Sequence, residues 1–456
     1  MSPSPLAAAP RWSSSLMFVL AATGAAVGLG NLWRFPFIAG ENGGGAFVLV
    51  YLAAVALIGL PIMLGELVIG RRGRGNAASA VASLSRESGA GGFWRIIGAL
   101  SVFIPFIGIG YYSVVAGWVV DYTATFVFAG GLGLETASQS QARFDAMLAS
   151  PGRLLLLHAA FMVAVILVVS LGVKDGIERA ARLMMPALFV LLLGLVVYAM
   201  IFGAFGEALA FLFRPNFAAL TGEAVLLAVG QAFFSLAIGI GALITYGAYL
   251  DDTSRLARAA AQICAADTAV AILAGLAIFP IVFSIDTLSP SAGPGLIFVT
   301  LPVAFADMQA GYMVGSAFFI LLFFAAFTTG IGTLEPVVSW AIGRGLRRRT
   351  AAWSAGGAAW VIGAAAALSF NDWAAVRPLA WVPGFADRGI FDLLDFSISN
   401  LLLPINGLFI ALFVGWAVPR ALVVDELGPA ADLVPVWRLF IRLLAPAAII
   451  AIVAFG

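Results

Sequence analysis

The feature that most constrains this chain is a series of long apolar runs, nearly free of charge and bounded by Arg, Asp, Gly or Pro. A helix that crosses the hydrocarbon core of a bilayer needs about 20 mostly apolar residues. The chain is 62% hydrophobic and only 10% charged, so it has too little polar material to cover a water-soluble surface. The bilayer is therefore its solvent. The expected spans are residues 12–38, 44–70, 93–126, 152–172, 180–203, 223–250, 256–284, 309–343, 350–370, 390–419 and 434–455.

These spans are expected to be helices. Backbone polar groups must be satisfied within the lipid, and a β-barrel would show short alternating segments instead of long apolar ones. The sequence therefore predicts an all-α membrane protein with 11 transmembrane helices in one domain, residues 1–456. Residues 11–26 also have features of a secretion signal, but the apolar run continues into Trp33, which favours a first membrane helix.

The basic residues predict the orientation of the chain. One set of loops holds most of them: Arg11, Arg71, Arg72, Arg74, Arg86, Arg95, Lys174, Arg179, Arg182, Arg255, Arg258, Arg344, Arg347, Arg348, Arg349, Arg420, Arg438 and Arg442. The opposite loops hold only Arg143, Arg153, Arg214, Arg377 and Arg388. The positive-inside rule then places the N-terminus in the cytoplasm and, after eleven crossings, the C-terminus outside.

The reactive side chains are few. The single cysteine, Cys264, excludes a disulfide framework and a cysteine metal cluster. The single histidine, His158, is interpreted as a satisfied side chain near the end of a span, with a proton relay as the alternative. A His-Glu-x-x-His metal motif and a Gly-x-x-x-x-Gly-Lys nucleotide loop are both absent from the sequence. We therefore do not expect an enzyme or a nucleic-acid-binding protein.

Two spans carry the same interruption. Residues 27–30 read Val-Gly-Leu-Gly, and residues 238–241 read Ile-Gly-Ile-Gly, each in the middle of an apolar span. Glycine costs about 1 kcal/mol in a helix interior relative to alanine, so these pairs favour unwinding. Unwound backbone at membrane depth is tolerated where it lines a cavity, and its free carbonyls and amides can bind ions and substrate. Close packing of small residues is the alternative interpretation.

Several ionisable residues lie within or near the ends of the spans. Glu66, Asp267 and Glu335 fall inside apolar segments, and Arg34 and Asp395 lie near the outer ends of the first and tenth spans. Such groups are expensive in a membrane and normally face the bundle interior with partners. We expect Glu66 to accept hydrogen bonds from backbone N–H groups that a broken helix sets free.

The sequence around the first interruption resembles a known family. Residues 24–36 (GAAVGLGNLWRFP) and 41–47 (ENGGGAF) resemble the first-helix signature of the neurotransmitter:sodium symporter family, and residues 230–236 (GQAFFSL) and 244–246 (ITY) continue the match. The resemblance implies import of an amino acid coupled to sodium by alternating access in a bacterial inner membrane. It also implies a 5+5 inverted repeat with broken helices 1 and 6, in which residues 1–203 and 223–419 are the repeats and 434–455 is a peripheral helix.

The resemblance also implies two sodium sites. The ligands of the first would be Ala26, Asn31, Ser235 and Asp267, and those of the second would be Gly24, Val27, Ala325, Thr328 and Thr329. Hard, mostly neutral oxygen ligands suit sodium. Beyond sodium, the amino acid and the lipid bilayer, no obligate protein partner is expected.

The same resemblance implies a substrate site at the two breaks. Its residues would be Ala25, Ala26, Gly28, Leu29, Gly30, Gly108, Tyr112, Val115, Phe234, Ala237, Ile240, Thr329 and Thr333. Backbone amides near Leu29 and Gly30, with Tyr112, would hold the carboxylate of the substrate. Because Gly108 and Ala237 are small, we expect a hydrophobic and large or aromatic L-amino acid.

The gates follow from the resemblance only in part. Arg34 and Asp395 match an outer ion pair above the lid Phe234, and Trp12 and Tyr249 match inner gate residues beside Arg11. The acidic partner expected for the inner arginine is replaced by Gly343, so the inner ion pair lacks its usual acid.

Asp267 has a further implication. Chloride-dependent relatives bind the anion among groups that match Tyr51, Gln231 and Ser235, and Asp267 replaces the neutral Asn usual beside that shell. A fixed carboxylate supplies the same charge, so we expect transport without chloride. The alternative is that Asp267 pairs with an arginine near the cytoplasmic end of its helix. A non-transporting sensor and a channel are less favoured, because two sodium cages and an occluding lid fit coupled transport.

Overall fold

The computed structural model describes residues 10–133, 136–285 and 295–455, and all regular elements in that part of the chain are helical. Nine of the described helices are long and apolar enough to cross a membrane. They are Gly45–Gly73, Gly92–Ala129, Pro151–Ser170, Val173–Phe202, Leu256–Phe283, Gly311–Gly343, Arg348–Leu368, Ile390–Ala417 and Arg420–Phe455. Most of these bounds lie within a few residues of the spans expected from the sequence, although the last helix begins earlier, at Arg420.

The first and sixth expected spans are not continuous helices. The first consists of α1 (Ser15–Ala26), followed after a break by η1 (Gly30–Arg34) and α2 (Phe35–Glu41), with a bend of 55°. The sixth consists of α11 (Gly222–Ser235) and α12 (Ala242–Ala248), separated by residues 236–241. The bent first pair gives up to ten membrane spans in the described residues by length and composition. Both interruptions predicted from the glycine pairs are therefore confirmed.

The second break depends on glycine. Gly239 and Gly241 have φ angles of +83° and +87°, which only glycine adopts without strain. A Cβ at Gly239 would lie 2.5 Å from the carbonyl oxygen of Leu403, and one at Gly241 would lie 2.5 Å from the carbonyl oxygen of Ser101. The neighbouring helices therefore approach the unwound segment too closely for any side chain at these two positions.

Side chains satisfy the backbone groups that the breaks set free. The carboxylate of Glu66 accepts from the N–H of Gly239 at 3.0 Å, and the amide of Asn406 donates to the Gly239 carbonyl at 2.7 Å. At the first break, the N–H of Gly28 donates to Asn31 at 3.1 Å. Unsatisfied buried backbone groups would cost about 1–3 kcal/mol each. The predicted role of Glu66 is therefore confirmed.

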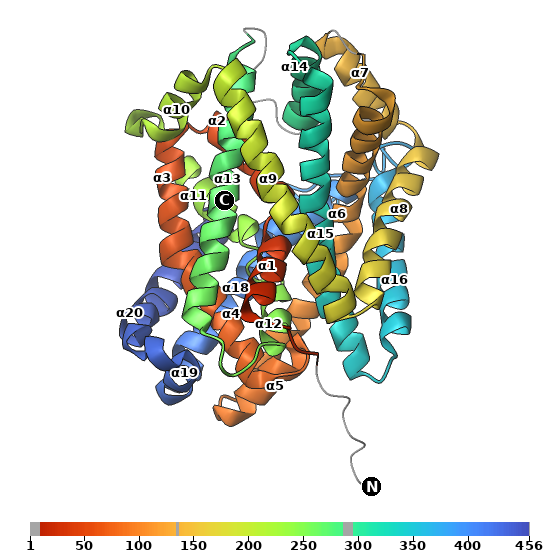
Figure 1. Cartoon of the computed structure of the whole chain (residues 1–456). Coiled ribbons are helices and arrows are strands. Elements are labelled where there is room, and N and C mark those ends of the chain that lie inside the picture. The colour runs from red at the N-terminus through yellow and green to blue at the C-terminus, as the bar shows by residue number, and fades with distance from the viewer. Residues whose placement is uncertain (1–9, 134–135, 286–294, 456) are drawn as a thin grey trace.

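The two broken helices lie in the middle of the bundle. Figure 1 shows α1 (red) beside α12 and α13 (Leu256–Phe283, both green). On its other side α1 packs on α15 (Gly311–Gly343) and α9 (Arg179–Phe202). Outside these, α6 (Arg95–Ala129) packs on α15, α8 (Pro151–Ser170) and α16 (Arg348–Leu368). Long continuous helices thus form a frame around the two interrupted ones.

Candidate functional site

Three buried polar side chains from three helices meet at the first break. The amide of Asn31, on η1, donates to Ser235 Oγ and to Asp267 Oδ1, both at 2.8 Å. The hydroxyl of Ser235, at the end of α11, donates to Asp267 Oδ2 at 2.5 Å. All three side chains are completely buried. The two broken helices and α13 are therefore linked by one carboxylate.

This cluster continues into a second layer. The hydroxyl of Tyr51 lies 3.1 Å from Ser235 Oγ, and the amide of Gln231 donates to the Gly30 carbonyl at 2.8 Å. Within the described residues, Asp267 has no ion pair with an arginine, because its oxygens accept from Asn31 and Ser235 instead. The alternative interpretation, in which Asp267 pairs with an arginine near the cytoplasmic end of its helix, is therefore wrong.

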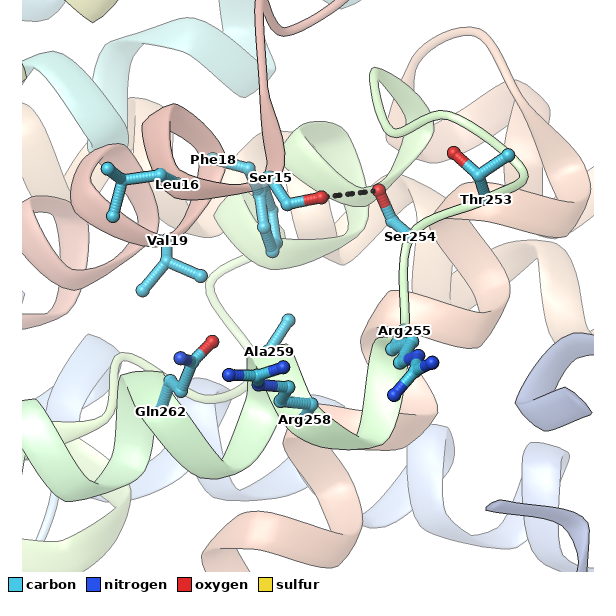
Figure 2. Close-up of a pocket in the computed structure, with 10 residues that line it drawn as sticks. All are labelled: Ser15, Leu16, Phe18, Val19, Thr253, Ser254, Arg255, Arg258, Ala259 and Gln262. Carbon is cyan, nitrogen blue, oxygen red and sulfur yellow. Dashed lines mark hydrogen bonds between the residues drawn. The ribbon is translucent and has the colours of Figure 1, made fainter. Parts of the chain in front are cut away.

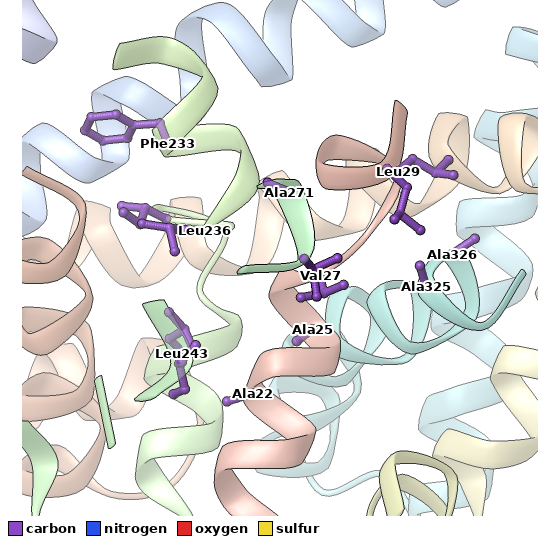
Figure 3. Packing of buried hydrophobic residues seen from close by; sticks show 14 of the residues in the cluster. Ala22, Ala25, Val27, Leu29, Phe233, Leu236, Leu243, Ala271, Ala325 and Ala326 are labelled. Atoms are coloured by element: carbon purple, nitrogen blue, oxygen red, sulfur yellow. The ribbon is translucent and has the colours of Figure 1, made fainter. Parts of the chain in front are cut away.

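A second oxygen cluster joins α1 to α15. The hydroxyl of Thr329 lies 3.1 Å from the Val27 carbonyl and 3.4 Å from the Gly24 carbonyl, while Thr328 Oγ lies 3.2 Å from the Ala325 carbonyl. Figure 3 shows Val27 at the break and Ala325 on α15 on facing segments. A Cβ at Gly28 would lie 2.6 Å from Thr329 Oγ1, so glycine at this position allows the approach.

Both clusters have the chemistry of an alkali-cation site. They offer carbonyl, hydroxyl, amide and carboxylate oxygens, which are hard ligands, and no sulfur or imidazole takes part. The first cluster carries one formal negative charge from Asp267, and the second is neutral. Sodium, as cargo, therefore fits both sets of donors.

A small cavity of about 60 Å³ lies between the two breaks. Its lining residues are Ala26, Gly28, Leu29, Gly30, Gly108, Tyr111, Tyr112, Phe234, Ala237, Ile240, Thr329, Thr333, Ile398 and Leu403. Tyr111, Ile398 and Leu403 were not predicted from the sequence, because Ile398 and Leu403 have apolar side chains and Tyr111 lies beside Tyr112, which the resemblance assigns to the site. The structure places Ala25 against Gly332, outside this lining, and places Val115 in a separate outer cavity.

Two features shape this cavity. Gly108 is buried, yet a Cβ built there would meet no other atom within 4 Å, so the position opens onto free space. The ring of Phe234 packs directly on Gly30, where a Cβ would lie 2.8 Å from the ring. The cavity therefore has room beside Gly108 and an aromatic ring beside Gly30.

A second cavity of about 320 Å³ lies beyond Phe234. It shares Leu29, Tyr111, Tyr112 and Phe234 with the small cavity, and it also contacts Arg34 and Asp395. These two side chains line the same space but form no ion pair within 4 Å in the described residues. The guanidinium of Arg34 instead lies over the Phe234 ring at 4.5 Å. In this structure the expected outer ion pair is therefore not formed among the described residues.

Trp12, just before α1, is buried against α12. Its indole N–H donates to the Tyr246 carbonyl at 2.9 Å, and its backbone N–H donates to the Tyr249 carbonyl at 3.2 Å. The hydroxyl of Tyr249 donates to Glu335 at 2.9 Å, and Glu335 forms an ion pair with Arg348 at 2.5 Å. These hydrogen bonds and this ion pair therefore link the beginning of α1 to α12, α15 and α16.

Arg11, which the resemblance places beside the inner gate, pairs with an acid at a different position from the expected one. Arg11 forms an ion pair with Asp251 at 3.5 Å, just after α12. The resemblance predicts the acid at position 343, where this chain has Gly343, whereas Asp251 and Asp252 follow the sixth span. His158 is buried rather than interfacial, and its two ring nitrogens lie 3.0 Å from Ser113 Oγ and the Trp360 carbonyl. Its interpretation as a satisfied side chain is confirmed.

The comparisons with known proteins agree with this geometry. The profile of the sodium:neurotransmitter symporter family matches residues 9–146 and 135–350. The sodium-dependent transporter YhdH of Bacillus subtilis is 35% identical over 448 residues, which cover 97% of this chain and 96% of that protein. The chain belongs to the sodium:neurotransmitter symporter family.

Other members of this family extend the comparison. A sodium-dependent transporter of Haemophilus influenzae is 32% identical, and the match covers 97% of this chain and 96% of that protein. The crystal structure of MhsT in complex with L-phenylalanine superposes with a TM-score of 0.87 at 41% identity, over 97% of this chain and 98% of that chain. As a family member, this chain is a multi-pass membrane transporter that uses sodium.

Proposed function

We propose that this transporter is a symporter that imports a hydrophobic, large or aromatic L-amino acid together with sodium, and that it does not require chloride. The observation that carries the proposal is the junction at the first break. There the oxygen cluster of Asn31, Ser235 and Asp267 adjoins a cavity that is lined by the unwound backbone of the first break and has open space at Gly108.

The unwound backbone would recognise the common part of an amino acid. Residues 28–30 line the cavity, and the amides of Leu29 and Gly30 can face a carboxylate as the N-terminus of a half-helix does, because the Gly28 N–H already donates to Asn31. The hydroxyl of Tyr112 lies close to Gly28, on the same side. A carboxylate bound there would also be near the Asn31 cluster and can complete the coordination of a first sodium ion.

The variable part of the substrate would lie toward Gly108, Ala237 and Ile240. Gly108 leaves space where most residues would project a side chain, and Phe234 offers an aromatic face above it. MhsT, which shares this fold at 41% identity, was crystallised with L-phenylalanine. Both points favour a large apolar or aromatic side chain, with Thr333 able to contact one polar group.

The two oxygen clusters explain how sodium can drive transport. The first connects η1, α11 and α13, and the second connects α1 to α15. Sodium bound in both would hold the two halves of the first broken helix against the surrounding frame. Because the substrate carboxylate contributes a ligand to the first ion, binding of sodium and substrate is mutually favourable, as linkage requires.

Chloride independence follows from Asp267. When ionised, the Asp267 carboxylate that Asn31 and Ser235 contact supplies a negative charge beside the first cation. A bound anion is then unnecessary for charge balance.

The topology is part of the proposal. We assign eleven spans by counting both broken helices as crossings, with residues 1–203 and 223–419 as inverted repeats and 434–455 in a peripheral helix. The basic loops place the N-terminus in the cytoplasm of a bacterium and the C-terminus outside the inner membrane. Alternating access would proceed by withdrawal of Trp12 on the inner side and closure of Arg34 and Asp395 over Phe234 on the outer side.

A thermal-shift screen tests the substrate class. The purified protein is heated with each of the twenty amino acids, once in sodium chloride and once in choline chloride. We expect large apolar or aromatic L-amino acids to raise the melting temperature only in sodium, because a ligand that binds the native state stabilises it. Stabilisation by small polar amino acids alone, or equal stabilisation in choline, would contradict the proposal.

A further inference from the structure

A cleft of about 370 Å³ lies between the beginnings of α1 and α13, and it shares no lining residue with the small cavity between the two breaks. Figure 2 shows Leu16, Phe18 and Val19 on α1 facing Arg258, Ala259 and Gln262 on α13. Ser15 and Ser254 close one end of the cleft, where their hydroxyl oxygens lie 3.1 Å apart. The cleft therefore has one apolar wall and one polar wall.

The polar wall suits an anion. It consists of two guanidinium groups (Arg255 and Arg258), hydroxyl groups of Ser15, Thr253 and Ser254, and the amide of Gln262, without a carboxylate among the lining residues. All of these groups can donate hydrogen bonds to phosphate oxygens. Arginine in particular matches the geometry of a phosphate group.

The acids nearest in sequence already have other partners. Asp251 forms an ion pair with Arg11, and Asp252 forms one with Arg74. Within residues 10–133, 136–285 and 295–455, neither Arg255 nor Arg258 forms an ion pair within 4 Å. Two positive charges at the cleft are therefore left for a ligand.

The position of the cleft indicates the source of that ligand. Two membrane helices begin here, at Ser15 and Leu256, so we infer that the cleft lies near the level of lipid headgroups. Leu16 is 62% exposed beside it, and Ala261 on the next turn of α13 is also exposed. A free phosphate ion would gain nothing from this apolar surface, whereas a phospholipid can lay an acyl chain along it.

We propose that this cleft binds the phosphate headgroup of an anionic phospholipid, with Arg258 and Arg255 on the phosphate and an acyl chain against Leu16. The lipid would then bridge α1 and α13 close to Trp12, which closes the inner side through Tyr246. Bound lipid would therefore stabilise the position of α1 in which the inner side is closed.

Native mass spectrometry of the delipidated protein in detergent provides the test. Phosphatidylglycerol and phosphatidylcholine with the same acyl chains are titrated separately, and the stepwise affinity of the first lipid is measured. Each basic residue near a membrane surface is worth about five-fold in affinity for an anionic lipid. We therefore expect Arg255→Gln/Arg258→Gln to weaken phosphatidylglycerol binding by roughly 30-fold and to leave phosphatidylcholine binding unchanged.

The control is Arg347→Gln/Arg349→Gln, which removes the same charge from two exposed arginines at the start of α16. This variant should bind phosphatidylglycerol as the wild type does, and Arg258→Lys should retain most of the binding because it keeps the charge. Equal loss in the control variant, or no loss in the cleft variant, would overturn the site. Displacement of phosphatidylglycerol by inorganic phosphate at matched ionic strength would show a soluble-anion site and overturn the lipid assignment.

Discussion

Replacing Asp267 with asparagine removes the negative charge of the buried cluster while keeping the size of the side chain. In the wild type, its two carboxylate oxygens accept from Ser235 at 2.5 Å and from Asn31 at 2.8 Å. The asparagine can still accept from Asn31, but its amide group must then donate to Ser235. The substitution therefore tests charge with little change in packing.

The size of the effect follows from this geometry. A sodium ion bound between Asn31 and Ser235 would lie within about 4 Å of the Asp267 carboxylate, because both side chains hydrogen-bond to that carboxylate. At this separation two unit charges attract by about 4 kcal/mol for an effective dielectric constant of 20. This corresponds to at most roughly a thousand-fold loss in sodium affinity. Chloride bound near Tyr51 and Gln231 should restore part of it.

Uptake into proteoliposomes is measured against sodium concentration, with chloride or gluconate as the anion. We expect the wild type to give the same half-saturating sodium concentration with both anions. Asp267→Asn should need far more sodium in gluconate, and chloride should partly rescue it. Asp432→Asn, which removes an exposed carboxylate elsewhere, is the matched control and should behave as the wild type does. Strong chloride dependence of the wild type would refute the reasoning.

Four further substitutions test other parts of the site. Gly108→Val should fold, because its Cβ enters free space. In competition assays it should weaken binding of aromatic substrates by about 1–3 kcal/mol more than binding of alanine, and an equal effect on all substrates would show that Gly108 is not part of the side-chain pocket. Arg34→Ala or Asp395→Ala should slow transport and leave sodium binding, measured by calorimetry, largely intact, since the two groups line the outer cavity without an ion pair. A parallel loss of sodium binding would show that these two residues have a structural role. Glu66→Ala should lower the free energy of unfolding by about 1–3 kcal/mol, because the Gly239 N–H loses its acceptor, and an unchanged melting temperature would argue against that role.

The breaks could be predicted from sequence because their cause is local. A glycine pair in an apolar span weakens the helix wherever the span lies, and Glu66 could be assigned because a buried carboxylate needs donors. Ala237 carried no such signal, although its φ of +51° places a non-glycine residue in the left-handed region next to Gly239. Its conformation depends on the tertiary contacts of the unwound segment.

Other parts of the site depended on distant contacts. The pairing of Arg11 with Asp251 and the position of Val115 follow from how whole helices pack, which residue spacing within one span does not determine. The same is true of Arg34, which lies over Phe234 instead of pairing with Asp395. The breaks and the support by Glu66 were thus predictable, whereas the contacts of Arg11 and Arg34 depend on the arrangement of the whole bundle.

The central claim is that a sodium gradient drives entry of a large hydrophobic amino acid through this site. The most direct measurement is the initial uptake of a radiolabelled aromatic L-amino acid into proteoliposomes, with an inward gradient of either sodium or choline at equal osmolarity. The account predicts accumulation with sodium, its collapse when a sodium ionophore dissipates the gradient, and only background uptake with choline. Equal uptake with choline, or uptake that the ionophore leaves unchanged, would contradict it.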